Sequence, residues 1–110
     1  MDKKKILITI ICIIVEATLV IFLFNKEWIL ALSFLILTVF SFMFLFDKYR
    51  KILFFIAFFV GPFCEYFAVM RGAWAYSYSS LSSLPLWLPF AWGFVVVGIF
   101  EIANFLKIKQ

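Results

Sequence analysis

The sequence predicts an all-α integral membrane protein, a bundle of four transmembrane helices with both termini in the cytoplasm. Three observations predict this fold. The chain is 67% hydrophobic over 110 residues, with a mean hydropathy of +1.16, which is more apolar surface than so short a chain buries in a water-soluble core. The apolar residues form four long runs. Eight of the ten Lys and Arg fall on one side of the resulting topology.

The four runs cover residues of about 6–24, 28–46, 52–70 and 84–106. Each is long enough to cross a hydrocarbon core of about 30 Å at 1.5 Å per residue. They lack the alternation of barrel strands, and helices satisfy their own backbone hydrogen bonds in lipid. We therefore expect one transmembrane domain over 1–110, with an outer loop at 71–83. The first run is long, contains Glu16 and is followed by no cleavage site, so it reads as a retained helix.

The net charge of +4 reflects the orientation of the chain in the membrane rather than nucleic-acid binding, because the basic residues gather on one side of the predicted topology. The side predicted to be cytoplasmic carries Lys3, Lys4, Lys5, Lys48, Arg50, Lys51, Lys107 and Lys109, whereas only Lys26 and Arg71 lie on the other side. This asymmetry predicts a multi-pass protein of the cytoplasmic membrane of a prokaryote. Membrane lipids are the expected partners, and anionic lipids suit the basic side.

Several catalytic classes lack the residues that they need. The chain has no His, and its two cysteines, Cys12 and Cys64, lie within apolar runs as small apolar residues do. It has no phosphate-binding loop and no glycine-rich dinucleotide motif. No cofactor and no metal site is therefore expected.

Three glutamates lie within the predicted spans, where a carboxyl group is costly unless it is protonated, paired or hydrated. Glu16 shares a helix face with Thr9 and Cys12, so it should point into the bundle. Glu101 shares a face with Asn104, and the simplest expectation is that Lys107 or Lys109 reaches toward it.

Glu65 has a more unusual setting. It lies in a stripe of small residues that allows close helix packing in lipid, formed by Ala57, Gly61, Ala68 and Gly72. Pro62 is expected to kink the helix. Glu65 should lie in the outer half of the membrane, and a kink or a partner helix would be needed to bring it to Arg71 at the outer interface.

Aromatic residues and prolines lie in and after the predicted outer loop. Trp74, Tyr76 and Tyr78 lie within it, and Trp87, Pro89 and Trp92 follow it. An interfacial aromatic belt would explain each residue alone. The set as a whole predicts a pocket with Glu65 and Arg71 as catalytic residues and with Trp74, Tyr76, Trp87 and Trp92 as ligand-binding residues. The helices over 52–70 and 84–106 should then be antiparallel neighbours.

The combination of Glu65, the segment GAWAYSY and the segment LPLWLPFAWG resembles polytopic carotenoid-modifying membrane enzymes, namely the bacterioruberin-pathway hydratases and, more faintly, the heterodimeric lycopene cyclases. The resemblance covers about 30 residues. It implies that Glu65 is the acidic position, that Trp74 and Tyr76 form the aromatic turn, and that Pro85 and Trp92 begin the fourth helix. Glu16, with Thr18 and Leu19, resembles the first helix of small multidrug-resistance transporters.

Three functions remain open from the sequence. The first is a pocket that binds an isoprenoid or another hydrophobic small molecule, or modifies it by acid catalysis from Glu65. The second is a proton-coupled transporter that uses Glu16 and works as a homo-oligomer. The third is a structural or assembly subunit that has a membrane partner and no site.

Overall fold

The structure is a computed structural model that describes residues 3–76, 79 and 83–109. Its regular elements are four helices, α1 (Lys3–Leu23), α2 (Glu27–Phe44), α3 (Lys48–Met70) and α4 (Leu88–Lys109). All four are long and apolar enough to cross a membrane. The predicted all-helical class is therefore confirmed.

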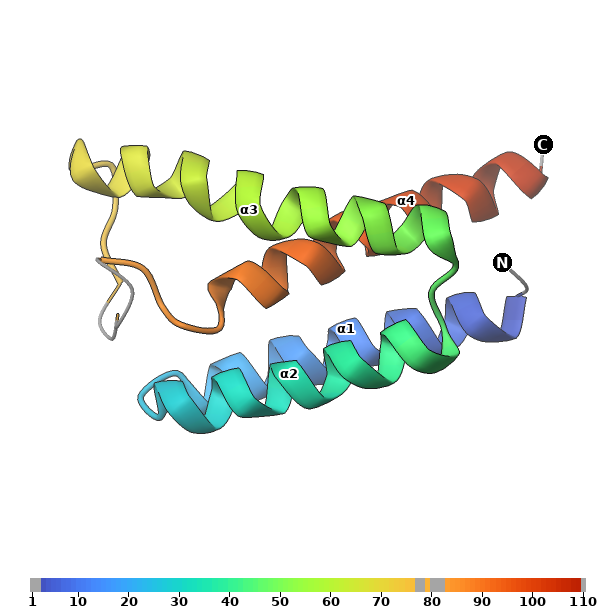
Figure 1. The fold of residues 1–110 in the computed structure, drawn as a ribbon, viewed down its shortest axis with the longest axis horizontal. Coiled ribbons are helices and arrows are strands. Elements are labelled where there is room, and N and C mark those ends of the chain that lie inside the picture. Colours follow the sequence, from blue (N-terminus) through green and yellow to red (C-terminus); the bar gives the residue numbers. More distant parts are fainter. Residues whose placement is uncertain (1–2, 77–78, 80–82, 110) are drawn as a thin grey trace.

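The helices form two antiparallel hairpins, α1–α2 and α3–α4 (Figure 1). Both chain ends and the α2–α3 linker lie at one end of the bundle, which we call the termini end; the opposite end is the loop end (Figure 1). The interface between α3 and α4 is the most extensive, which confirms their predicted pairing, and α4 also packs on α1 and α2. Side chains on α4 are therefore held by three other helices.

The helix boundaries differ from the predicted ones where side chains cap the backbone. α3 begins at Lys48, earlier than expected, because the Asp47 side chain accepts a hydrogen bond of 2.9 Å from the backbone N–H of Arg50. α4 begins at Leu88, later than expected, with Pro89 in its first turn, where no N–H is required. α3 runs through Pro62 as one continuous helix.

The core is built from aromatic rings around α4. Phe54 of α3 meets Phe94 of α4 edge to face, with ring centroids 5.3 Å apart. The Phe54 ring lies so close to Gly93 that a β-carbon there would come within 2.5 Å of it. Large apolar side chains also cover the outside of every helix, and Phe22 and Trp28 are among the most exposed. An apolar core inside an apolar surface is typical of a membrane protein.

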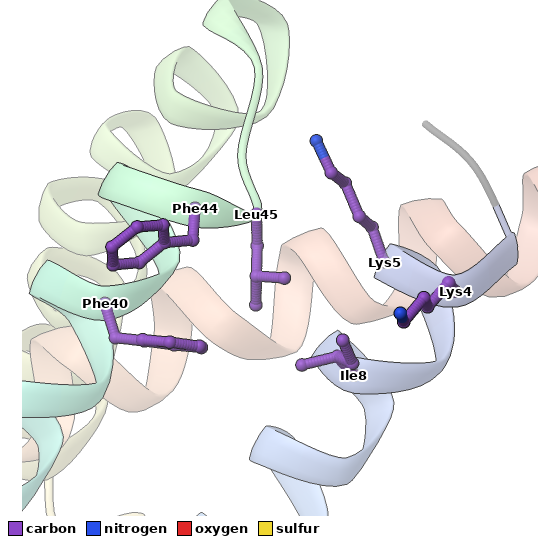
Figure 2. Close-up of a pocket in the computed structure, with 6 residues that line it drawn as sticks. All are labelled: Lys4, Lys5, Ile8, Phe40, Phe44 and Leu45. Atoms are coloured by element: carbon purple, nitrogen blue, oxygen red, sulfur yellow. The ribbon is translucent and has the colours of Figure 1, made fainter.

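Several hollows interrupt this surface, among them the following two. One, of about 410 Å³, lies at the termini end between the first turns of α1 and the end of α2 (Figure 2). The other runs between α3 and α4 and lies beside Glu65, where the sequence predicts a site.

Candidate functional site

Glu65 forms a polar cluster at the loop end of the α3–α4 hairpin. The Tyr76 hydroxyl donates a hydrogen bond to one of its carboxylate oxygens, and the Trp92 indole N–H donates to the other. We call Glu65, Tyr76 and Trp92 the outer cluster. It joins α3, the connecting loop and α4 through a single side chain.

A glycine allows this arrangement. Gly61 lies one turn before Glu65, and a β-carbon at Gly61 would come within 2.2 Å of the Trp92 ring. The indole therefore lies directly on the backbone of α3. In that position its N–H reaches Glu65, so the small-residue stripe of α3 and the hydrogen bond to the carboxylate are parts of one contact.

An apolar groove lies beside the outer cluster, and we call it the α3–α4 groove. It has a volume of about 240 Å³ and apolar walls, formed by Leu53, Ile56, Ala57, Val60, Gly61, Cys64, Trp92 and Val96. Trp92 belongs both to this wall and to the outer cluster. Cys64 is exposed and lies next to Glu65 in the sequence, whereas Cys12, the other free cysteine, is buried.

Tyr76 lies in the loop after α3, and its surroundings keep it protonated. Burial raises the pKa of its phenol, and the hydrogen bond to Glu65 and the negative charge of that carboxylate raise it further. Trp92 can only donate, because an indole has no acceptor. Both donors therefore suit an ionised Glu65.

Of the other three residues predicted for this pocket, two lie elsewhere. Arg71 is exposed, and its backbone N–H closes the last turn of α3. Trp74 is also exposed, but its side chain hydrogen-bonds Tyr76, so it lies at the edge of the outer cluster. Trp87 packs edge-on against Phe34 of α2, with ring centroids 6.0 Å apart. The structure thus brings Glu65, Tyr76 and Trp92 together, with Trp74 beside Tyr76, but not Arg71 or Trp87. Tyr78 lies outside the described residues.

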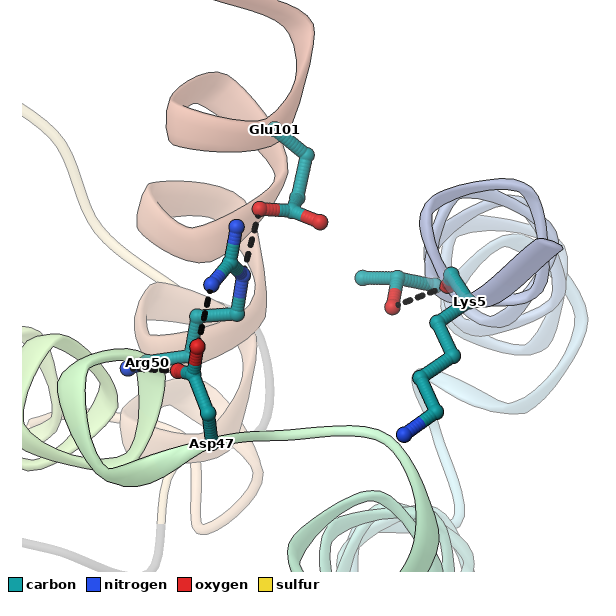
Figure 3. Close-up of polar contacts among 5 residues, drawn as sticks. Lys5, Asp47, Arg50 and Glu101 are labelled. Atoms are coloured by element: carbon teal, nitrogen blue, oxygen red, sulfur yellow. Dashed lines mark hydrogen bonds and ion pairs between the residues drawn. The ribbon is translucent and has the colours of Figure 1, made fainter. Parts of the chain in front are cut away.

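A second polar cluster lies at the termini end of the same hairpin. The Arg50 Nε donates to Glu101 at 2.6 Å, and its guanidinium pairs with Asp47 at 2.7 Å (Figure 3). Glu101 is completely buried and Arg50 is only 6% exposed. The Arg50 guanidinium also lies 5.1 Å from the centre of the Phe100 ring. We call Asp47, Arg50 and Glu101 the inner cluster.

This cluster corrects an expectation. Glu101 pairs with Arg50 of α3 and not with Lys107, which is exposed; the Lys109 side chain lies outside the described part of the chain. The sequence did carry a signal for this pair. Asp47 is a good N-cap, so α3 includes Arg50, which continues the buried stripe of Phe54, Ala57 and Gly61 along the helix.

Glu16 is buried in α1, as its helix face predicts, together with Thr9 and Cys12. It is 4% exposed, and among the described residues its Oε1 atom has no hydrogen-bond partner. Asn104 is half-buried one turn after Glu101. Glu16 therefore has one carboxylate oxygen without a hydrogen-bond partner among the described residues, as Glu101 also has, but Glu16 lies outside both clusters.

Comparison with protein-family models, with curated proteins and with solved structures finds no match to this chain. The fold itself defines the class, an all-helical chain of four helices with the length and hydropathy of membrane spans.

Proposed function

We propose that this protein is a multi-pass membrane protein that binds an elongated, lipid-soluble molecule of the isoprenoid type in the α3–α4 groove. The observation that carries the proposal is the position of the outer cluster beside the groove. A long apolar wall that ends at a single hydrogen-bonded carboxylate suits a molecule with an apolar chain and one polar end.

The orientation follows from the distribution of charge. The basic residues concentrate at the termini end, so we place that end in the cytoplasm and the outer cluster toward the opposite face. The groove then lies at the depth of the acyl chains. A lipid-soluble molecule would enter it sideways from the bilayer, and an aqueous path would not be needed.

The outer cluster supports binding more strongly than proton transfer. Both oxygens of Glu65 accept hydrogen bonds, so in this arrangement each is engaged with a donor and neither faces a group that would take a proton from it. The carboxylate can accept a hydrogen bond from a ligand hydroxyl in place of the one from Tyr76. Acid catalysis on an isoprenoid double bond would require a protonated Glu65 that donates its proton to the alkene carbon.

The test uses Cys64 as a reporter of the groove. In purified protein, Cys64 is expected to react with a maleimide while the buried Cys12 stays unmodified. Geranylgeraniol should slow this reaction, because a chain lying in the groove covers the thiol. Cetyl alcohol, a saturated alcohol, is the comparison probe that measures selectivity for an isoprenoid.

Two variants separate the groove from the carboxylate. Val60→Trp fills the groove without changing the outer cluster, and it should abolish the protection of Cys64. Glu65→Gln should weaken protection by geranylgeraniol, whereas the same change at Glu16 should leave it intact. Equal labelling with and without the alcohol would overturn the proposal and would favour a structural subunit.

Glu16 favours a second candidate function, proton-coupled transport. A buried carboxyl group with one oxygen that has no partner among the described residues is suited to take up and release a proton as the bundle changes shape. This function requires an oligomer, because four helices enclose little pathway. Proton-driven efflux of a cationic dye from liposomes, lost in Glu16→Gln and kept in Glu65→Gln, would support it, whereas a monomer without such efflux would contradict it.

A further inference from the structure

Near the termini end, each of the four helices turns one polar side chain into the bundle. These are Thr9 of α1, Ser41 of α2, Arg50 of α3 and Glu101 of α4, and we call them the polar layer. Arg50 is 6% exposed, and the other three are completely buried. Two atoms of the layer, Ser41 Oγ and Glu101 Oε2, have no hydrogen-bond partner among the described residues. Buried polar atoms in folded proteins are nearly always paired, so both atoms need a partner.

The register of α1 and α2 brings Thr9 and Ser41 to the same level. The two residues are equally far along the chain from the connection between these antiparallel helices. Their neighbours Ile8 and Phe40 line one hollow together (Figure 2). Because Thr9 and Ser41 are completely buried, their side chains face the interior of the bundle.

Contacts between α1 and α4 bring Glu101 to this level as well. A β-carbon at Gly98 would come within 2.4 Å of the Ile13 side chain, so these two residues lie opposite each other. The two helices are antiparallel (Figure 1). One turn from this contact toward the termini end, α1 has Thr9 and α4 has Glu101. The three completely buried members of the layer therefore converge on one part of the interior.

The layer offers both a donor and acceptors for a further hydrogen bond. Thr9 donates to the backbone carbonyl of Lys5, so its oxygen can only accept another bond. Ser41 makes no such bond within its own helix, and its hydroxyl can still donate. Arg50 binds one oxygen of Glu101, and the other oxygen points toward α1 (Figure 3).

We propose that the polar layer encloses one water molecule, which accepts a hydrogen bond from Ser41 and donates to Glu101 Oε2 and Thr9 Oγ. A buried water makes about three hydrogen bonds, and this set supplies one donor and two acceptors. A metal cation is disfavoured, because the Arg50 guanidinium already faces the same carboxylate. The water joins α1 and α2 to α4, so it holds the first hairpin in register with the second. This role goes beyond the proposed function and does not depend on the α3–α4 groove.

The same register explains why the water belongs to this layer and not to Glu16. At the level of Glu16, α2 has Phe34 and α4 has Phe94, and both are apolar and completely buried. A water at that level would have the Glu16 carboxylate and no second polar partner from either helix.

The first test is a crystal structure of the whole protein grown from a lipidic mesophase. We expect one density peak within about 3 Å of both Ser41 Oγ and Glu101 Oε2. A direct hydrogen bond between these side chains, or Ser41 turned onto the carbonyl of Leu37 with no density between the helices, would overturn the proposal. Unfolding in sodium chloride and in choline chloride should have the same midpoint. Stability that depends on sodium would identify a cation in place of the water and would also overturn it.

The second test measures stability in mixed micelles. Ser41→Ala removes the donor and should raise the unfolding equilibrium constant about tenfold. Ser33→Ala is the control, because it removes an exposed hydroxyl that bonds only its own helix, and it should change the constant by less than about twofold. In the double variant Arg50→Met with Glu101→Leu no carboxylate remains to hold the water. Adding Ser41→Ala there should also have less than about a twofold effect.

An effect of about tenfold in both backgrounds would show that Ser41 acts through packing alone and would overturn the proposal. Equal effects of Ser41→Ala and Ser33→Ala would do the same. Protection of Cys64 by geranylgeraniol is measured on the same single variants and should be unchanged. A failure of the water bridge is thereby distinguished from a failure of the groove.

Discussion

The two polar clusters of the α3–α4 hairpin hold a carboxylate in opposite ways. Glu101 is completely buried and is paired with a charged guanidinium. Glu65 is half-buried, receives hydrogen bonds from two neutral groups and lies beside an apolar groove. The inner cluster needs no charged group from outside the protein, because Arg50 supplies the positive charge that pairs with Glu101. Among the described residues, no cation pairs with the outer cluster, and neutral donors hold its carboxylate.

This difference separates a structural from a functional use of the same residue type. An ion pair shielded from solvent fixes the register of two helices, and its carboxylate is inaccessible to a ligand. A carboxylate held by neutral donors can exchange one of them for a ligand group. The hairpin thus has one end where an ion pair holds the two helices in register and one end where a hydrogen-bond donor can be replaced by a ligand. Each of the following predictions tests one of these two ends.

The largest effect is expected at the inner cluster. Arg50→Ala leaves Glu101 buried without its cation and should lower the free energy of unfolding by roughly 3–5 kcal/mol. Denaturation in mixed micelles measures this loss. The double variant Arg50→Met with Glu101→Leu should recover most of it, because no buried charge remains. A loss below about 1 kcal/mol in Arg50→Ala, the range of an exposed pair, would remove the distinction between the clusters.

A smaller effect is expected where Trp92 lies on Gly61. Gly61→Ala places a methyl group against the indole ring and should destabilise the hairpin by about 1–3 kcal/mol. Tryptophan fluorescence should shift as the indole leaves Glu65. Gly98→Ala is the control, because the nearest atom there is the flexible end of Ile13, which can move aside. Equal losses in both variants would contradict the close Gly61 contact.

Asp47 should contribute about 1 kcal/mol as the N-cap of α3. Asp47→Ala should lose this contribution, whereas Asp47→Asn should keep most of it, since Asn also caps helices. The hydrogen bond from the Arg50 backbone holds the pKa of Asp47 below its usual value. Its stabilisation is therefore complete above about pH 4 and is lost as the pH falls through the lower folded value. Unfolding measured across this acidic range tests the assignment.

The smallest change is spectroscopic and concerns Tyr76. Its raised pKa means that the stabilising protonated form persists below the ordinary tyrosine value of about 10 and is lost only as the pH rises through the higher folded value. Ultraviolet titration of tyrosinate should show one late step, which Tyr76→Phe removes. Glu65→Gln should move that step to lower pH, because the negative charge is gone. An unchanged step would separate Tyr76 from Glu65.

The sequence predicts the helices well because their signal is continuous over many residues. Four apolar runs of membrane length leave few alternatives, and the packing of α3 on α4 follows from the short connection between them. Glu65 and Trp92 could be expected to lie near each other for the same reason. Arg71 could not be placed, because its position depends on the conformation of a loop that has no periodicity.

The inner cluster was not predicted from the sequence, because the start of the third helix was placed too late. Because that helix was expected to begin at residue 52, Arg50 was placed in the linker before it and was used only as one of the basic residues that predict orientation. The Asp47 cap extends α3 backward and turns Arg50 toward Glu101. The Asp47 cap thus places Arg50 inside the bundle, where it pairs with Glu101. Hydropathy alone does not reveal a capping hydrogen bond of this kind.

The hydroxyl side chains of α1 and α2 have a consequence for how the protein is made. Thr9, Thr18, Ser33 and Thr38 each donate to the backbone carbonyl four residues earlier in their own helix. Both polar clusters lie within the α3–α4 hairpin. During synthesis, α1 and α2 leave the ribosome first and need no later segment to satisfy these hydroxyls. We expect the first hairpin to enter the bilayer before the second, with Glu16 and Ser41 as the polar side chains that become buried only when the second hairpin packs against it.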